Sequence, residues 1–312
     1  MCSAAPLAPP RPRGGARGGA EKLTQVDING LSVKVWEKWR EEEHVWPAAK
    51  ILADYLISPA TRPPYCGSAD LIVEAGAGTG LLSLILGAAA EESAAQSQSA
   101  PAWPPVVATD CDRAALRNMK RNVQENGLGR RVSIQEWNWL FPTLPPWSAE
   151  VDLLVASDII YDNTTAYLHL SRHLAEILSR HHRNTQGAAS QEQEVSTQGG
   201  TSHHGPIALM LLQVRNGGQG YTGSSVEAFV SDLRARKLQV ECLKLPPSCT
   251  RAYQEDFPDL HERLHLLQIS APAHTPVDFK SSPGAYGRLD RTCLGDGMCD
   301  EEILAMWQQS DL

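Results

Sequence analysis

Apolar and polar positions follow two different periods along this chain, and together they predict alternating strands and helices. Short apolar runs that end in a polar or charged residue are typical of buried strands, whereas apolar positions three or four apart are typical of helices. The predicted strands span residues 71–74, 106–110, 131–137, 151–157, 206–214, 238–245 and 261–270. The predicted helices span residues 47–56, 81–88, 113–127, 164–181 and 224–236.

This alternation predicts the fold class. Strands separated by helices are typical of a mainly parallel sheet with both faces covered, so we expect an α/β, Rossmann-like, doubly wound sheet of seven strands. The last two strands have no predicted helix between them, and we expect them to form an antiparallel hairpin at the sheet edge. Ahead of the sheet, Asn29-Gly30 separates two alternating runs and predicts another hairpin over residues 26–36.

Composition divides the chain into one domain and three polar segments. Residues 1–25 are rich in Pro, Gly, Ala and Arg, and we expect them to be disordered. The domain spans 26–272 and contains an inserted loop at 89–105 and a polar insert at 183–205, which we also expect to be disordered. Residues 273–312 form a polar, acidic tail.

Overall composition excludes several classes of protein. A hydrophobic content of 42% is enough to build a core, and no apolar stretch has the length of a membrane span. The net charge of −8 argues against non-specific binding to nucleic acid. The seven cysteines contain no CxxC pair, so we expect neither a disulfide framework nor a metal site. We expect a monomer in the cytoplasm, with a nuclear location left open, and no membrane partner.

An apolar strand runs into the glycine-rich sequence Glu74-Ala-Gly76-Ala-Gly78-Thr-Gly80. Glycines between a strand and a helix let the backbone approach a ligand closely. The dinucleotide fingerprint requires glycine at its sixth place, where this chain has Leu81, and a Walker loop requires a lysine. Glu74 would repel a phosphate and suits a cation. The loop therefore favours S-adenosylmethionine, which carries an ammonium and a sulfonium; the alternative is a glycine turn without a function.

Polar residues follow the second predicted strand. Asp110 ends that strand, where an acid accepts hydrogen bonds from the ribose hydroxyls of a ligand; the alternative is that Asp110 or Asp112 caps the next helix. On that helix Asn118, Asn122 and Asn126 repeat every four residues. We expect Asn118 to lie on a solvated face, although asparagine is a poor helix residue and its repetition indicates side-chain hydrogen bonding.

Tryptophans provide a second candidate contact. Trp137-Asn138-Trp139 closes the third predicted strand. The two indole rings would flank an adenine ring while the amide contacts its edge, or else they are core aromatics under a loop. Trp46, before the first predicted helix, is likewise either a core residue or a wall of the ligand pocket.

The fourth predicted strand ends at Ser157, followed by Asp158 and, three residues later, Tyr161. Ligands of open α/β sheets lie beyond the carboxyl ends of the strands, so Asp158 and Tyr161 are placed to face a reacting group. The alternative is that Asp158 caps a turn and Tyr161 packs. Ile159 and Ile160 stand where adenine N6-methyltransferases have prolines, which argues against a base of DNA or RNA as substrate.

These motifs, in the order in which they occur along the chain, resemble those of methyltransferase family 16. The characterised members of that family mostly methylate protein lysines. The resemblance covers roughly residues 26–270 and rests on Val-Trp-Pro-Ala-Ala at 45–49, the glycine loop, and the motifs at 122–126, 137–139 and 156–162. Two positions depart from the family pattern. Ala75 stands where leucine is common, and Asn138 stands where aspartate is common.

The resemblance implies a seven-β-strand, class I enzyme that uses S-adenosylmethionine. It implies catalytic roles for Asp158 and Tyr161 and a cofactor site formed by Trp46, Glu74, Gly76, Gly78, Gly80, Asp110, Asn138, Trp139 and Ser157. The expected reaction is transfer of a methyl group to a lysine side chain of a protein. The alternatives are the same transfer to arginine, histidine or a small amine, and a non-catalytic scaffold that binds the cofactor and a protein partner.

Overall fold

The central part of the chain forms one seven-stranded sheet in the computed structural model, which describes residues 21–38, 44–96, 103–160, 166–189, 205–214, 225–253 and 259–272. The strands are β3 (Ile72–Ala75), β4 (Val106–Asp110), β5 (Val132–Glu136), β6 (Leu153–Ser157), β7 (Ile207–Gln213), β8 (Gln239–Leu243) and β9 (Leu264–Ser270). Their order is β5-β4-β3-β6-β7-β9-β8, with β8 and β9 antiparallel to each other. The predicted fold class is confirmed.

The strands at the centre of the sheet are apolar because both of their faces are covered. Every residue of β3 and β4 is buried, and in β6 and β7 only the last residue is partly exposed. Continuous apolar runs are typical of parallel strands between two helical layers. Strands β5 and β8, at the two edges, carry several exposed residues.

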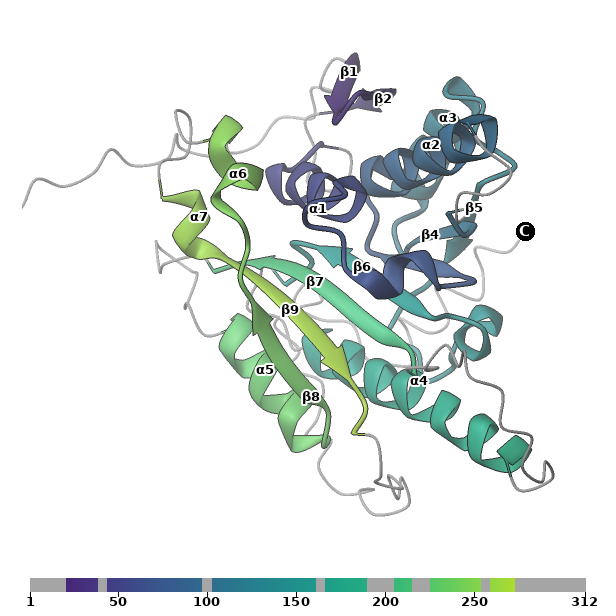
Figure 1. The fold of residues 1–312 in the computed structure, drawn as a ribbon, viewed down its shortest axis with the longest axis vertical. Helices are drawn as coiled ribbons and strands as arrows, with labels where there is room; N and C mark the ends of the chain where they lie inside the picture. The colour runs from purple at the N-terminus through teal and green to yellow at the C-terminus, as the bar shows by residue number, and fades with distance from the viewer. Residues whose placement is uncertain are drawn as a thin grey trace, which may run out of the picture.

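Helices cover both faces of the sheet (Figure 1). On one face lie α1 (Pro47–Ile57), α2 (Leu81–Gln96) and α3 (Arg113–Glu125), and on the other lie α4 (Ala166–Ala189) and α5 (Ser225–Ala235). The core accordingly has two parts, one containing Leu52 and Leu82 and the other containing Leu174 and Phe229.

A two-stranded hairpin packs on the first helical layer. It consists of β1 (Lys22–Ile28) and β2 (Leu31–Glu37), joined at Asn29 and Gly30 with φ of 49° and 84°. Two successive positive φ values define the predicted type I′ turn. Strand β1 begins at Lys22, four residues before the predicted start of the domain at residue 26.

Two helices extend beyond their predicted ends. Helix α2 continues to Gln96, into the predicted loop at 89–105, because its alanine-rich end favours helix without an apolar period. Helix α4 continues to Ala189, into the predicted insert at 183–205. The antiparallel pair of β8 and β9 lies at the sheet edge as predicted, with β8 outermost and β9 between β7 and β8.

Short helical turns connect several elements. They are η1 (Pro64–Gly67), η2 (Pro146–Ala149), α6 (Pro247–Thr250), η3 (Arg251–Tyr253) and α7 (Leu260–Arg263). The last three separate β8 from β9, where a direct hairpin connection was expected. Among the helices that the structure describes, none is long and apolar enough to cross a membrane. Most residues of the predicted segments 1–25 and 183–205, and the whole of the predicted tail at 273–312, lie outside the described residues.

Candidate functional site

Three neighbouring strands end at the same edge of the sheet and bring the candidate residues together. β3 lies between β4 and β6, and Glu74 of β3 is level with Ala108 of β4 and Val155 of β6. The direction of the strand order reverses between β3 and β6. Ligands of open α/β sheets bind at such a reversal, beyond the carboxyl ends of the strands. In this chain that place lies between the glycine loop after β3 and the segment after Ser157.

The glycine loop adopts a backbone that requires glycine. Gly76, Gly78 and Gly80 have φ of 61°, 54° and 79°. A Cβ at Gly76 would lie 2.7 Å from Cγ2 of Ile159 and 3.6 Å from the ring of Trp139, and a Cβ at Gly80 would lie 2.6 Å from Cγ of Met119. Close packing within the protein therefore explains two of the three glycines, in addition to the conformation of the loop.

Neighbouring elements hold the backbone of this loop in place. The Ala77 N–H donates to the Thr109 carbonyl at 2.8 Å, and the Gly78 N–H donates to Oδ2 of Asp110 at 2.9 Å. The Thr79 carbonyl accepts from Nδ2 of Asn122 at 2.9 Å. The loop is thus fixed from both β4 and α3.

Glu74 is a buried carboxyl group next to the loop. Only 1% of its surface is exposed, and its Oε2 accepts from the Ser83 backbone N–H at 2.9 Å and from the Ser83 hydroxyl. The pKa of Glu74 is raised to about 8, chiefly by burial and to a smaller extent by nearby Asp110, while the Ser83 hydrogen bonds oppose the shift. A cation bound beside this carboxyl group would favour its ionised form, as expected for an ammonium ligand.

Asp110 binds backbone N–H groups on two sides. Its Oδ2 accepts from Gly78 and its Oδ1 accepts from Asp112 at 2.9 Å. Burial raises the pKa of Asp110, and these backbone donors oppose the shift. The helix cap is Asp112, whose Oδ1 accepts from the Ala115 N–H at 2.7 Å. Asp110 is therefore not the cap, and an ionised carboxylate has further lone pairs for ribose hydroxyls.

The two tryptophans after β5 have different environments. Trp137 is buried among Trp147, Trp139 and His173, so it is a core residue. Trp139 is only partly buried and approaches Gly76, which places it at the glycine loop. Asn138 lies between them, and its Oδ1 accepts from the Leu140 N–H at 3.0 Å, which closes a tight turn.

His173 supports this turn from α4. Its Nδ1 accepts from Nε1–H of Trp137 at 3.1 Å, so its Nε2 carries the proton and donates to the Phe141 carbonyl at 2.8 Å. Burial lowers the pKa of His173, which favours this neutral form. Neither a period nor a motif in the sequence indicated this contact.

Trp46 is exposed over 41% of its surface, which rules out a core role. It directly precedes α1, and its ring meets His44 edge-on with centroids 5.3 Å apart. Nδ1 of His44 lies 3.0 Å from Oε2 of Glu37, at the end of β2. A role for Trp46 as a wall of the ligand site remains a prediction.

Asp158 follows Ser157 at the end of β6 and has an unusual backbone. Its φ is 53°, its N–H donates to the Leu211 carbonyl at 2.8 Å, and its side chain is buried. Left-handed conformations of non-glycine residues are uncommon and concentrate at functional sites. The next residue, Ile159, packs against Gly76, so Asp158 lies beside the glycine loop. Tyr161 lies outside the described residues.

One prediction on α3 was wrong. Asn118 is buried, and its Nδ2 donates to the Trp36 carbonyl at 2.8 Å, so it does not lie on a solvated face. The N-terminal hairpin covers this face of the helix. The repeated asparagines in the sequence were the signal for this contact, but they did not identify its partner.

Comparison with known proteins gives one family match. The model of a family described as lysine methyltransferase (methyltransferase family 16) matches residues 28–194, which is more than half of the chain. No curated protein matches the sequence significantly.

The chain is also similar to solved structures at low identity. One is a Streptococcus mutans protein assigned to the S-adenosylmethionine-dependent methyltransferases, with 12% identity and a TM-score of 0.47, covering 80% of this chain and 56% of that chain. Another is the CMeT domain of the citrinin polyketide synthase, with 13% identity and a TM-score of 0.45, covering 74% and 54%. This chain spans little more than half the length of either.

Proposed function

This chain belongs to the lysine methyltransferase family, and we propose that it uses S-adenosylmethionine to transfer a methyl group to a lysine side chain of a protein substrate. The family match supports the reaction class. The observation that carries the proposal for the site is the buried, left-handed Asp158 beside the glycine loop.

The residues around the loop fit the cofactor chemically. S-adenosylmethionine supplies an electrophilic methyl group on a positively charged sulfur. We assign Glu74, the buried acid whose ionised form a cation would favour, to the ammonium end of the ligand. Asp110 is assigned to the ribose hydroxyls. Trp139, partly exposed at the loop, and Asn138 are assigned to the adenine ring.

The protein must bring a neutral amine to the methyl group. A lysine amine has a pKa of about 10.4, so its deprotonation at neutral pH costs about 4–5 kcal/mol. Asp158 would orient the amine by accepting a hydrogen bond from it and would stabilise the positive charge that develops on the nitrogen. Its left-handed backbone supports this role, since a strained conformation persists only where the surrounding structure holds it.

Tyr161 is assigned from the family motif that it shares with Asp158. An aromatic ring three residues after Asp158 would provide a face for the sulfonium or for the methylammonium product. Substitution of Tyr161 by Phe should preserve this function, whereas substitution by Ala should remove it.

The substrate class can be tested with tritiated S-adenosylmethionine and lysate from cells in which the gene is disrupted. The control is the same lysate after acetylation, which converts lysine amines into amides that cannot accept a methyl group and, after hydroxylamine treatment, leaves arginine and histidine intact. We expect a labelled protein in the first lysate and none in the second. Label that survives the block would show an arginine or histidine acceptor, and label only in small molecules would show a small amine. Cofactor binding without any transfer would favour a scaffold.

A further inference from the structure

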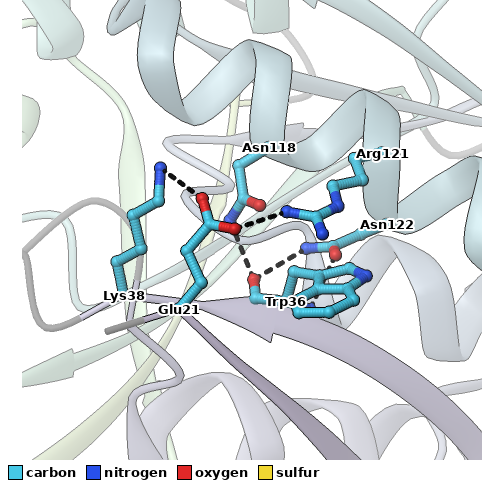
Figure 2. A network of polar contacts seen from close by, with 6 residues as sticks. All are labelled: Glu21, Trp36, Lys38, Asn118, Arg121 and Asn122. Atoms are coloured by element: carbon cyan, nitrogen blue, oxygen red, sulfur yellow. Dashed lines mark hydrogen bonds and ion pairs between the residues drawn. The ribbon is translucent and has the colours of Figure 1, made fainter. Parts of the chain in front are cut away.

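Two asparagines of α3 and the asparagine that caps its C-terminus bind the backbone of β2 at Lys34 and Trp36. Oδ1 of Asn122 accepts from the Trp36 N–H at 2.8 Å, and Nδ2 of Asn118 donates to the Trp36 carbonyl at 2.8 Å (Figure 2). At the C-cap of α3, Asn126 accepts from the Lys34 N–H at 2.8 Å and donates to the Lys34 carbonyl at 2.7 Å.

This arrangement follows from the residue periods of the helix and of the strand. Residues four apart lie on one face of a helix, and residues two apart point the same way along a strand. A carboxamide carries one acceptor and one N–H₂ donor group, like a peptide unit. The asparagines therefore satisfy the N–H and C=O groups of Lys34 and Trp36 on the edge of β2 that faces α3, as a neighbouring strand would.

Charged groups hold the same two elements together at the surface. Arg121 places its guanidinium 3.7 Å from the centroid of the Trp36 ring and donates to Oε2 of Glu21 at 2.9 Å. Oε1 of Glu21 lies 3.0 Å from Nζ of Lys38 (Figure 2). These groups are partly exposed, so their ion pairs stabilise the contact little. The buried amides of Asn118 and Asn122 are the stronger link.

Asn122 makes a contact with the glycine loop that Asn126 does not make. Both bind β2, but Nδ2 of Asn122 also donates to the Thr79 carbonyl at 2.9 Å and, at 3.3 Å, to the Trp36 carbonyl. Asn122 is 0% exposed, so its amide is fully removed from water. Thr79 lies between Gly78 and Gly80. Without the bond from Asn122, the backbone there would be the most flexible part of the glycine loop.

We propose that Asn122 is a positioning residue of the cofactor site, which fixes the Thr79 carbonyl of the glycine loop against strand β2 and so couples the N-terminal hairpin to cofactor binding. The inference rests on the cofactor assignment of the proposed function and is independent of the methyl acceptor. A loop that is already ordered loses less conformational entropy when a ligand binds. Without Asn122, that ordering would have to occur during binding.

The matched comparison is Asn122→Ala against Asn126→Ala, because both remove bonds to β2 but only the first removes the bond to Thr79. Binding of S-adenosylhomocysteine is measured by isothermal titration, and thermal unfolding is followed by circular dichroism. We expect Asn122→Ala to weaken binding about tenfold, the scale of one lost buried hydrogen bond, and Asn126→Ala to leave it within about twofold. Equal affinities of the two variants would overturn the proposal. Wild-type protein that does not bind would instead count against the proposed function.

Two further measurements do not depend on the stability of Asn122→Ala. Asn122→Asp keeps the acceptor for the Trp36 N–H but loses both donors, and we expect it to weaken binding as much as Asn122→Ala. In the wild-type protein, S-adenosylhomocysteine should slow hydrogen exchange of the β2 peptide as well as that of the glycine loop, because coupling between sites is reciprocal. Exchange in β2 that does not respond to the ligand would overturn the proposal.

Discussion

Asp110 and Gly78 are joined by a hydrogen bond of 2.9 Å from the backbone N–H of the glycine loop to the carboxylate Oδ2. The bond links the end of β4 to the turn after β3, so the residue assigned to the ribose also shapes the loop. Oδ1 of the same carboxylate accepts from the Asp112 N–H. Loss of Asp110 would therefore affect ligand contacts and loop geometry together.

Asp110→Ala should weaken cofactor binding strongly. Charge-assisted hydrogen bonds contribute about 1.5–3 kcal/mol each, and the variant would lose those to the ribose as well as the bond to Gly78. Asp112→Ala is the matched control, since it removes the α3 cap and should lower the free energy of unfolding by about 1 kcal/mol without changing affinity. Isothermal titration with S-adenosylhomocysteine and urea unfolding measure the two effects. Similar affinities for the two variants would contradict the ribose assignment.

Glu74 should make the stability of the fold depend on pH. Burial raises its pKa from 4.5 to about 8. Below about pH 4.5 the carboxyl is neutral in both states; as the pH rises towards 8, the unfolded chain ionises while the folded chain holds the proton, so stability is lost. Relative to Glu74→Gln, the free energy of unfolding of the wild-type protein should fall between about pH 5 and 8. A constant difference in urea unfolding across this range would contradict the prediction.

Cofactor binding should release a proton from Glu74 near neutral pH. The ammonium of S-adenosylmethionine would favour the ionised carboxylate, whereas the free protein holds the proton up to a pKa of about 8. Titrations at about pH 7 in two buffers of different ionisation enthalpy measure the number of protons released. The wild-type protein should release protons and Glu74→Gln should not. Equal release by both proteins would place the ammonium elsewhere.

Local patterns in the sequence predicted most of the fold. The Asn29-Gly30 turn, the spacing of the glycines and the buried strands each depend on neighbouring residues, and the structure contains them all. The position of β9 between β7 and β8 could not be predicted in this way, because it depends on how strands far apart in the chain pair.

Contacts in the candidate site were predictable to different degrees. Trp137 and Trp139 look alike in the sequence, yet Trp137 is a core residue and Trp139 lies at the glycine loop. Residues two apart point the same way only within a strand, and β5 ends at Glu136, before both tryptophans. The helical period placed Asn118 and Asn122 on one face. It could not show that a hairpin more than eighty residues away covers that face.

Asp158 can be tested separately from the cofactor. Asp158→Asn removes the charge but keeps a side chain that tolerates the observed φ of 53° and can still cap a turn. If the carboxylate orients the amine and stabilises its charge, the transfer rate at saturating cofactor should fall by a factor of about 100 or more, while affinity for S-adenosylhomocysteine stays within about twofold. Transfer is measured with tritiated cofactor on the labelled protein identified above.

Asp158→Ala provides the structural comparison. Alanine in a left-handed conformation is disfavoured by about 1–2 kcal/mol, so this variant should be less stable than Asp158→Asn, and Asp158→Gly should recover stability but not activity. All three variants lack the carboxylate, but they differ in how readily their backbone adopts the left-handed conformation. A loss of activity shared by all three would therefore reflect the carboxylate, and differences in stability among them would reflect backbone strain. If Asp158→Asn were fully active, the charge would have no part in the reaction, and orientation of the amine by the rest of the site would have to account for the rate.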